Sequence, residues 1–272
     1  METKKFNWQF LNATTLKLIA AALMFIDHIH EMFSHVGAPM WLTMLGRLVF
    51  PMFLFASSES FHYTHSKKRY LIRLLIASWF MSTFTFILQS VLPNDNVVLI
   101  NNAFSTFFVT GLYMLFWDIF VDGVHKKSVP KIIGAILLCF VPVLLTLPML
   151  IGGVLSVSES ISPNVVRYIA IFSLYLPNIL TVEGGCLFVL LGLLFYIFRK
   201  SRVLQILVLV AMSTYIFIVG DRIQSIMIFA AVPIALYNGE RGKGIKNFFY
   251  IYYPLHLSFF YMLIYLGAKI TA

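Results

Sequence analysis

Apolar segments of about 20 residues recur along the whole chain, and this recurrence constrains the fold more than any other feature. A helix of about 20 residues crosses about 30 Å of hydrocarbon at 1.5 Å per residue. Backbone amides in lipid must be hydrogen-bonded within their own segment, which favours helices. Stretches such as 132–145 are apolar on every face rather than alternating, which excludes a β-barrel. We therefore predict an all-α, polytopic integral membrane protein.

Ten hydrophobic segments are predicted, joined by linkers too short for a soluble domain. They cover residues 14–34, 41–61, 70–92, 98–120, 131–152, 165–180, 184–198, 203–219, 222–237 and 246–267. We expect a single transmembrane domain over residues 1–272 with nine or ten transmembrane helices. No internal repeat is evident, so an inverted-repeat transporter gains no support.

Composition agrees with a protein whose main surroundings are membrane lipids. Hydrophobic residues make up 60% of the chain and charged residues 11%, against about a quarter charged in ordinary soluble domains. The net charge of +9 lies in short clusters between apolar segments, which indicates membrane topology and not nucleic-acid binding. Cys139 and Cys186 both lie in apolar segments, so neither a disulfide framework nor a metal site is predicted.

The positions of Lys and Arg predict a plasma-membrane protein with a cytoplasmic N-terminus. Lys4 and Lys5 precede the first segment, and basic clusters follow the second and fourth. Two later clusters, at 199–202 and 241–246, are cytoplasmic only if residues 165–198 cross the membrane once. A broken or re-entrant segment there, around Pro177 and Gly184, satisfies this condition.

The first segment carries an ionisable pair, Asp27 and His28, half to two-thirds of the way across. Such groups cost at least about 2.5–3.5 kcal/mol on insertion scales, so each is a functional hypothesis. A carboxylate beside an imidazole can orient the ring and raise its basicity, as a general base requires. The alternative is a buried polar pair that holds helices together. Arg47 on the second segment lies at a similar depth to Asp27, which predicts a salt bridge between them.

Further polar residues follow in the sequence. Asn101 and Asn102 open the fourth segment, where they cap a helix or hold a substrate carbonyl. Glu183 precedes two glycines, and His256 is a second intramembrane histidine behind Pro254. The glycine-rich basic turn at 237–244 combines amides with cations and suits either phosphate or anionic lipid headgroups.

These motifs, in this order and over nearly the full length, resemble the TraX family of bacterial membrane proteins. They are Leu16–Ala20, Ile26–Ile29, Gly46–Phe53, Tyr237–Gly242 and Phe249–Leu257. TraX proteins are associated with acetylation of the N-terminus of conjugative pilin. The family is grouped with heparan-α-glucosaminide N-acetyltransferase and bacterial membrane O-acyltransferases. Nothing in this chain identifies a conjugation system, so pilin is not carried over as the acceptor.

The resemblance implies transfer of an acetyl or other acyl group from cytoplasmic acyl-CoA to an acceptor at or across the membrane. His28 would be the general base, Asp27 would orient it, and Arg47 would support the carboxylate or an oxyanion. The cofactor-binding set would be Tyr237, Asn238, Arg241 and Lys243 with Lys68 and Arg69; the substrate-binding set would be Asn101, Asn102, Glu183 and His256. The acceptor would be a peptide or protein N-terminus, a saccharide or a lipid. Glu240 places an anion beside the expected phosphate site, which weakens that assignment.

Two other functions stay open. A proton-coupled secondary transporter would use Asp27, His28, Arg47 and His256 as a relay. A non-catalytic membrane assembly factor would use the same residues to join helices. The acyl chain length and the oligomeric state, including a homodimer, are not predicted.

Overall fold

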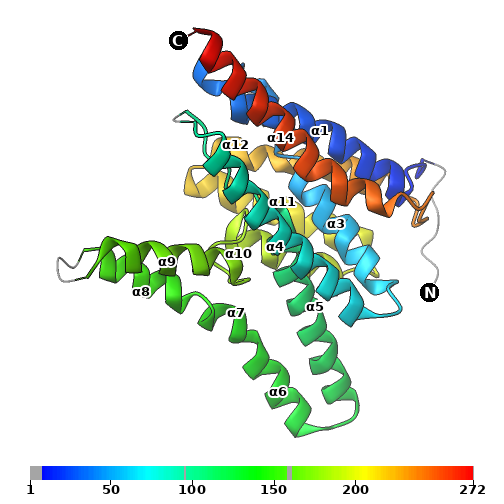
Figure 1. The fold of residues 1–272 in the computed structure, drawn as a ribbon. Helices are drawn as coiled ribbons and strands as arrows, with labels where there is room; N and C mark the ends of the chain where they lie inside the picture. The colour runs from blue at the N-terminus through cyan, green and yellow to red at the C-terminus, as the bar shows by residue number, and fades with distance from the viewer. Residues whose placement is uncertain (1–7, 95, 158–160, 272) are drawn as a thin grey trace. The chain divides into compact units, whose positions relative to one another are not determined.

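The chain is built from helices in the computed structural model, which describes residues 8–94, 96–157 and 161–271 (Figure 1). The α-helices are α1 (Ala13–Phe33), α2 (Trp41–Gly46), α3 (Val49–His62), α4 (Lys67–Val91), α5 (Ala103–His125), α6 (Val129–Cys139), α7 (Val141–Leu144), α8 (Leu147–Ser156), α9 (Pro163–Tyr175), α10 (Gly185–Ile197), α11 (Arg202–Val219), α12 (Arg222–Ser225), α13 (Ala231–Ala235) and α14 (Lys246–Thr271). Two 3₁₀ helices, η1 (Ser34–Val36) and η2 (Ile226–Ala230), complete the set. The predicted all-α class is confirmed.

Six helical spans among the described residues are long and apolar enough to cross a membrane. They are Trp41–His62, Lys67–Val91, Ala103–His125, Val129–Ser156, Arg202–Val219 and Asn247–Gly267. Shorter apolar helices cover Gly185–Ile197 and Arg222–Ala235, where two further hydrophobic segments are predicted. Helix α1 is outside the six, and its polar residues Lys17, Asp27 and Glu31 lower its hydropathy. The chain is a multi-pass membrane protein, as its sequence predicts.

The helices form two compact units, each made of separate stretches of sequence. Unit 1 contains residues 1–62, 84–99 and 194–272, and unit 2 contains residues 63–83 and 100–193. Helices α4 and α10 contribute to both units. The single domain predicted for residues 1–272 stays a prediction.

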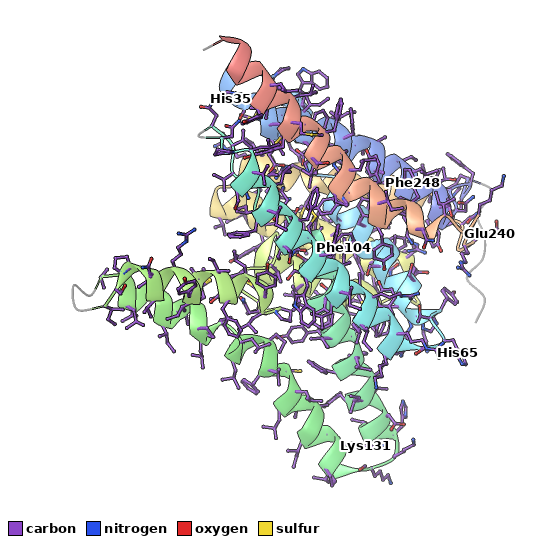
Figure 2. All side chains as sticks on the ribbon, viewed as in Figure 1. His35, His65, Phe104, Lys131, Glu240 and Phe248 are labelled. Atoms are coloured by element: carbon purple, nitrogen blue, oxygen red, sulfur yellow. The ribbon has the colours of Figure 1, made fainter. Side chains whose placement is uncertain are left out.

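In unit 1, helices α1 and α14 run side by side in the same direction (Figure 1). The hydroxyl of Tyr252 donates to the carbonyl of Ala21 at 3.0 Å. About two to three turns further along the helices, the rings of Phe33 and Phe260 meet edge to face, with centroids 6.2 Å apart. Figure 2 labels Phe248 at one end of this pair and His35 at the other. Residues far apart in the sequence therefore lie at matching positions along one helix pair.

One end of unit 1 contains the start of α1, the end of α3, the start of α11 and the turn at 236–245. We call this end the basic end. Ser60 on α3 accepts from Lys17 on α1 at 3.2 Å. The guanidinium of Arg202 on α11 lies 4.4 Å from the Phe55 ring centroid and 5.0 Å from that of Tyr237. The clusters at 199–202 and 241–243 thus lie at the end where α1 starts, as the predicted topology requires. Lys4 and Lys5 are outside the described residues.

Backbone and side-chain hydrogen bonds join the turn at 236–245 to the start of α1. Leu11 and Tyr237 form a short parallel bridge, and the amide of Ala13 donates to the carbonyl of Glu240 at 2.8 Å. The hydroxyl of Thr14 is bonded to the carbonyls of Arg241 and Lys243. These hydrogen bonds fix the turn against the start of α1.

Unit 2 contains two helical hairpins. Helices α5 and α6 pack closely at Gly123, where an added Cβ would lie 3.0 Å from Ile132. Helices α8 and α9 pack at Gly152, which faces Ile169 in the same way. Both pairs are visible in Figure 1. Small residues at these crossings allow close approach, which is how helices associate where lipid competes for apolar contacts.

The predicted break within residues 165–198 is present in unit 2. Helix α9 ends at Tyr175 and α10 begins at Gly185; each has 13 residues, or about 20 Å at 1.5 Å per residue, which is short of a full crossing. The side chain of buried Asn178 accepts from the amides of Leu180 and Thr181 and donates to the carbonyl of Leu176. One amide side chain therefore satisfies backbone groups where no helix does.

Gly242→Ala is expected to loosen the turn from α1. Gly242 has φ +71° and an added Cβ would lie 2.3 Å from the Asn12 side-chain oxygen, so backbone strain and a clash together should cost about 1–3 kcal/mol. Gly244→Ala is the matched control, because its Cβ meets nothing within 4 Å. Thermal unfolding in detergent measures both variants, and equal melting temperatures for them contradict the prediction.

Candidate functional site

Two histidines from opposite ends of the sequence form a hydrogen-bonded dyad in unit 1. His28 on α1 and His256 on α14 are each 4% exposed. Their Nδ1 and Nε2 atoms, respectively, are 2.6 Å apart. The ring centroids are 4.8 Å apart and the planes differ by 11°, so the rings meet edge to edge in nearly one plane. The parallel packing of α1 and α14 creates this contact.

The carbonyl oxygen of Tyr252 determines which nitrogen donates in the dyad. It lies 2.6 Å from Nδ1 of His256, and a carbonyl only accepts, so Nδ1 of His256 carries a proton. In a neutral His256 the Nε2 atom is then the acceptor, and Nδ1 of His28 must donate to it. Neutral His28 therefore has its lone pair on Nε2, which is the form a general base needs.

Aromatic side chains enclose His256. The ring of Tyr252 stacks on it with centroids 4.6 Å apart and planes 18° apart, and Tyr253 contacts both histidines. Phe25 and Phe260 complete the surroundings at 6.4 and 6.5 Å. Pro254 interrupts the hydrogen bonding of α14 in the middle of this group. An apolar enclosure strengthens the hydrogen bonds inside it, because water does not compete for them.

The other edge of the His28 ring faces Glu31. Nε2 of His28 and a carboxylate oxygen of Glu31 are 3.5 Å apart, one helical turn from each other on α1. The Glu31 side chain is 36% exposed, whereas that of His28 is 5% exposed. The Nε2 edge is therefore the side of the dyad that is nearer the surface.

Arg47 and Asp27 form the predicted salt bridge, with Nη2 and Oδ1 3.1 Å apart. Arg47 also donates to the carbonyl and hydroxyl of Thr43 and to the side-chain oxygen of Gln224 at 3.1 Å. Gly46 makes this approach possible, because a Cβ there would lie 2.0 Å from Asp27. Arg47 therefore joins α1, α2 and α12 through one guanidinium.

This geometry changes the expected division of roles among the first polar residues. The hydrogen-bond partner of the His28 ring is His256 and not Asp27, because neighbouring residues on a helix point about 100° apart. The Nε and Nη2 atoms of Arg47 already donate hydrogen bonds to Thr43 and Asp27. We therefore interpret Asp27 and Arg47 as a neutral pair that fixes the position of α1, the helix that carries His28 of the dyad.

The predicted cofactor residues of the turn lie at the basic end with different surroundings. Tyr237 is 3% exposed, under Phe55 and Arg202. The side chain of Asn238 accepts from the amide of Glu240 and donates to its carboxylate. Arg241 and Lys243 are exposed. Of the turn residues, these two cations are the ones that can reach a phosphate.

The start of α1 offers few amides to an anion. The amide of Ala13 donates to Glu240, that of Thr15 to the Asn12 side chain, and that of Leu16 to the Asn12 carbonyl. Any phosphate bound here would depend on side-chain charge more than on the helix terminus. His28 lies 16 residues beyond Asn12, or about 24 Å along α1 at 1.5 Å per residue.

The remaining predicted residues belong to unit 2. Lys68 and Arg69 are exposed in the first turn of α4. Asn102 caps α5 by accepting from the amide of Ser105, so the capping interpretation is correct for it, and its amide also donates to Ser78 and Ser82. The side-chain oxygen of Asn101 is buried and has no hydrogen-bond partner among the described residues.

Glu183 lies in unit 2 as well, at the end of the irregular stretch before α10. Its backbone carbonyl accepts from the hydroxyl of Thr106 on α5 at 2.9 Å. Gly184 and Gly185 follow with positive φ angles of 77° and 69°. The two glycines thus form the turn into α10, and the carbonyl of Glu183 connects that turn to α5.

Sequence reasoning missed four residues that contact the site: Thr43, Gln224, Tyr252 and Glu31. Gln224 and Thr43 are polar residues within apolar segments, and this signal is present in the sequence. Tyr252 acts through its carbonyl, which no side-chain pattern reveals. Glu31 lies three residues after His28 on a helix, a spacing that brings side chains to one face.

Arg47→Met is expected to lower the free energy of unfolding by about 2–4 kcal/mol, because it leaves Asp27 without its partner in a mostly buried site. The double variant Asp27→Asn with Arg47→Met should recover part of this loss, because no unpaired charge remains. Detergent unfolding of the wild type, both single variants and the double variant measures the coupling. Additive effects of the two substitutions would show that the bridge contributes nothing to stability.

Among known proteins, one family matches this chain. A family model described as "TraX protein" matches residues 12–264. No curated protein and no solved structure matches the chain. The matched range includes both helices of the dyad, the Arg47 bridge and the basic turn. Because the match covers most of its length, the chain belongs to the TraX family.

Proposed function

We propose that the protein is a membrane-embedded acyltransferase that moves an acetyl or other acyl group from acyl-CoA to an amine or hydroxyl acceptor. The observation that carries the proposal is the buried His28–His256 dyad, in which His28 has a lone pair on Nε2. Family membership agrees with it, since the resemblance implies acyl transfer. An imidazole in this form, within an apolar helix pair, suits proton transfer at a reacting group.

The proposed reaction uses Nε2 of His28 as the general base. As the acceptor attacks the thioester carbonyl, its proton passes to Nε2. The carbon–sulfur bond of the tetrahedral intermediate then breaks, and His28 returns the proton to the leaving thiolate of CoA. His256 stabilises the imidazolium in between, because it accepts a hydrogen bond from Nδ1 of His28.

The acyl donor is proposed to bind at the basic end. Arg241 and Lys243 provide exposed positive charge for the phosphates of CoA. The thioester would then reach His28 along α1, over about 24 Å from the helix start. A long, flexible pantetheine arm suits such a separation between the phosphates and the reacting carbon.

His28→Ala should abolish acyl transfer and leave CoA affinity within a few-fold of the wild type, because the base is lost but the phosphate contacts remain. Purified protein with labelled acetyl-CoA and candidate acceptors measures transfer, and calorimetry measures CoA binding. His35→Ala is the control, because His35 is an exposed histidine beyond the end of α1. Transfer that persists in His28→Ala contradicts the role of this base.

Arg241→Ala should weaken CoA binding by about 1–3 kcal/mol, the scale of a lost charged hydrogen bond. The maximal rate with bound donor should stay close to that of the wild type, because the dyad is distant from Arg241. Arg222→Ala is a matched control on another helix of the same unit. Unchanged CoA affinity in Arg241→Ala would place the phosphate site elsewhere.

One observation favours a second function, a proton-coupled transporter. The hydrogen bond between the rings of His28 and His256 can pass a proton from one histidine to the other within the apolar interior. Proton flux in proteoliposomes separates the two functions. Flux that requires His28 without any CoA binding favours the transporter, whereas acetyl-CoA turnover without flux favours the acyltransferase.

A further inference from the structure

Lys17 is a partly buried cation in the second turn of α1, at the basic end of unit 1. Its ammonium group donates to the hydroxyl of Ser60 on α3 at 3.2 Å. Among the described residues, no carboxylate forms a salt bridge with Lys17. An ammonium group carries three N–H donors, and Ser60 accepts from one of them. Lys17 therefore has both charge and donors left for a ligand.

Arg241 is a second cation close to Lys17. Thr14 lies one helical turn before Lys17, on the same face of α1, and its hydroxyl is hydrogen-bonded to the backbone carbonyls of Arg241 and Lys243. The charges of Lys17 and Arg241 are near enough to repel each other. The Arg241 side chain is exposed, and it forms no hydrogen bond or ion pair with the described residues.

The described carboxylates of the basic end have other partners. Glu59 on α3 interacts with Arg202 on α11, and the Glu240 carboxylate accepts from the side chain of Asn238 at 3.2 Å. Neither forms a salt bridge with the two neighbouring cations. A positive charge in partly apolar surroundings is unfavourable when no anion is close. An anionic ligand would therefore stabilise both cations.

We propose that Lys17 and Arg241 together bind the 3′-phosphate of CoA, the only phosphate monoester in this donor. This inference rests on the proposed acyl transfer, and it assigns Lys17 as a further donor-binding residue. A phosphate monoester carries about 1.5–2 negative charges at pH 7, whereas each phosphate of the pyrophosphate bridge carries about one. Two neighbouring cations without a carboxylate therefore match the charge of the monoester.

The types of side chain also suit a phosphate monoester. A guanidinium can contact two phosphate oxygens side by side, and an ammonium group adds a point charge at another oxygen. Ser60 orients the ammonium group from α3, and Thr14 fixes the backbone of Arg241 one helical turn away. Phosphatidic acid, an anionic lipid, carries the same monoester group. The shared chemistry is therefore the phosphate monoester, and CoA is the source that we propose.

Lys17→Met tests the assignment, because methionine has a similar length and no charge. Calorimetry with the purified full-length protein in detergent measures the affinities for CoA and for dephospho-CoA, which lacks only the 3′-phosphate. The wild type should bind CoA at least about tenfold more tightly than dephospho-CoA, since charged hydrogen bonds to the monoester are strong. In Lys17→Met, CoA affinity should fall at least about tenfold and dephospho-CoA affinity should change less than about threefold.

Further variants separate this role from a structural one or from general attraction. Lys17→Arg keeps the charge and should retain the preference for CoA over dephospho-CoA. Lys200→Met removes an equal charge from an exposed position at the same end of unit 1, and it should leave the ratio of the two affinities unchanged. A purely structural Lys17 would affect thermal unfolding and not this ratio. If Lys17→Met does not fold, the ratio in Arg241→Ala decides, and it should fall toward one.

The outcomes distinguish this inference from the proposed function. Equal affinity of the wild type for CoA and dephospho-CoA, or a preference for CoA that persists in Lys17→Met, overturns the inference and leaves acyl transfer standing. The inference is also wrong if phosphatidic acid raises the melting temperature only when Lys17 is present while the preference for CoA does not depend on Lys17. No CoA binding by the wild type overturns the proposed function and this inference together.

Discussion

Polar groups buried between apolar helices must find their partners inside the protein, and unit 1 depends on this requirement. It is met twice on α1. Asp27 is paired with Arg47, and His28 is paired with His256. The first pair joins α1 to α2 and α12, whereas the second joins α1 to α14. One helix therefore holds together three parts of the chain that are far apart in the sequence.

The two pairs also differ in charge and in proposed role. The Asp27–Arg47 bridge combines opposite charges into a neutral group, and Thr43 and Gln224 take further donors of Arg47. The histidine pair needs no net charge at all, since one ring donates and the other accepts. A neutral imidazole with a free lone pair is what proton transfer requires. The same requirement for buried partners thus stabilises the fold and prepares the proposed base.

The turn proposed to bind the donor and the proposed base lie at different positions along α1. The start of α1 is joined to the turn with Arg241 and Lys243 by backbone and hydroxyl hydrogen bonds. The dyad lies about 24 Å further along the helix, and Glu31 follows one turn later. Donor binding and proton transfer are proposed at successive levels of a single helix. The bonds that join the turn to α1 maintain this spacing.

The sequence alone determined the class of protein, the helical spans, the break near Pro177 and the Asp27–Arg47 bridge. Hydropathy and length are local properties, and the bridge follows from two charges at equal depth on neighbouring helices. Only the tertiary structure decided that His28 meets His256, because a contact between residues 228 positions apart depends on the parallel packing of α1 and α14. It also decided which nitrogen of His28 carries the lone pair of the proposed base. A backbone carbonyl makes that choice, and its position depends on how α14 is turned toward α1.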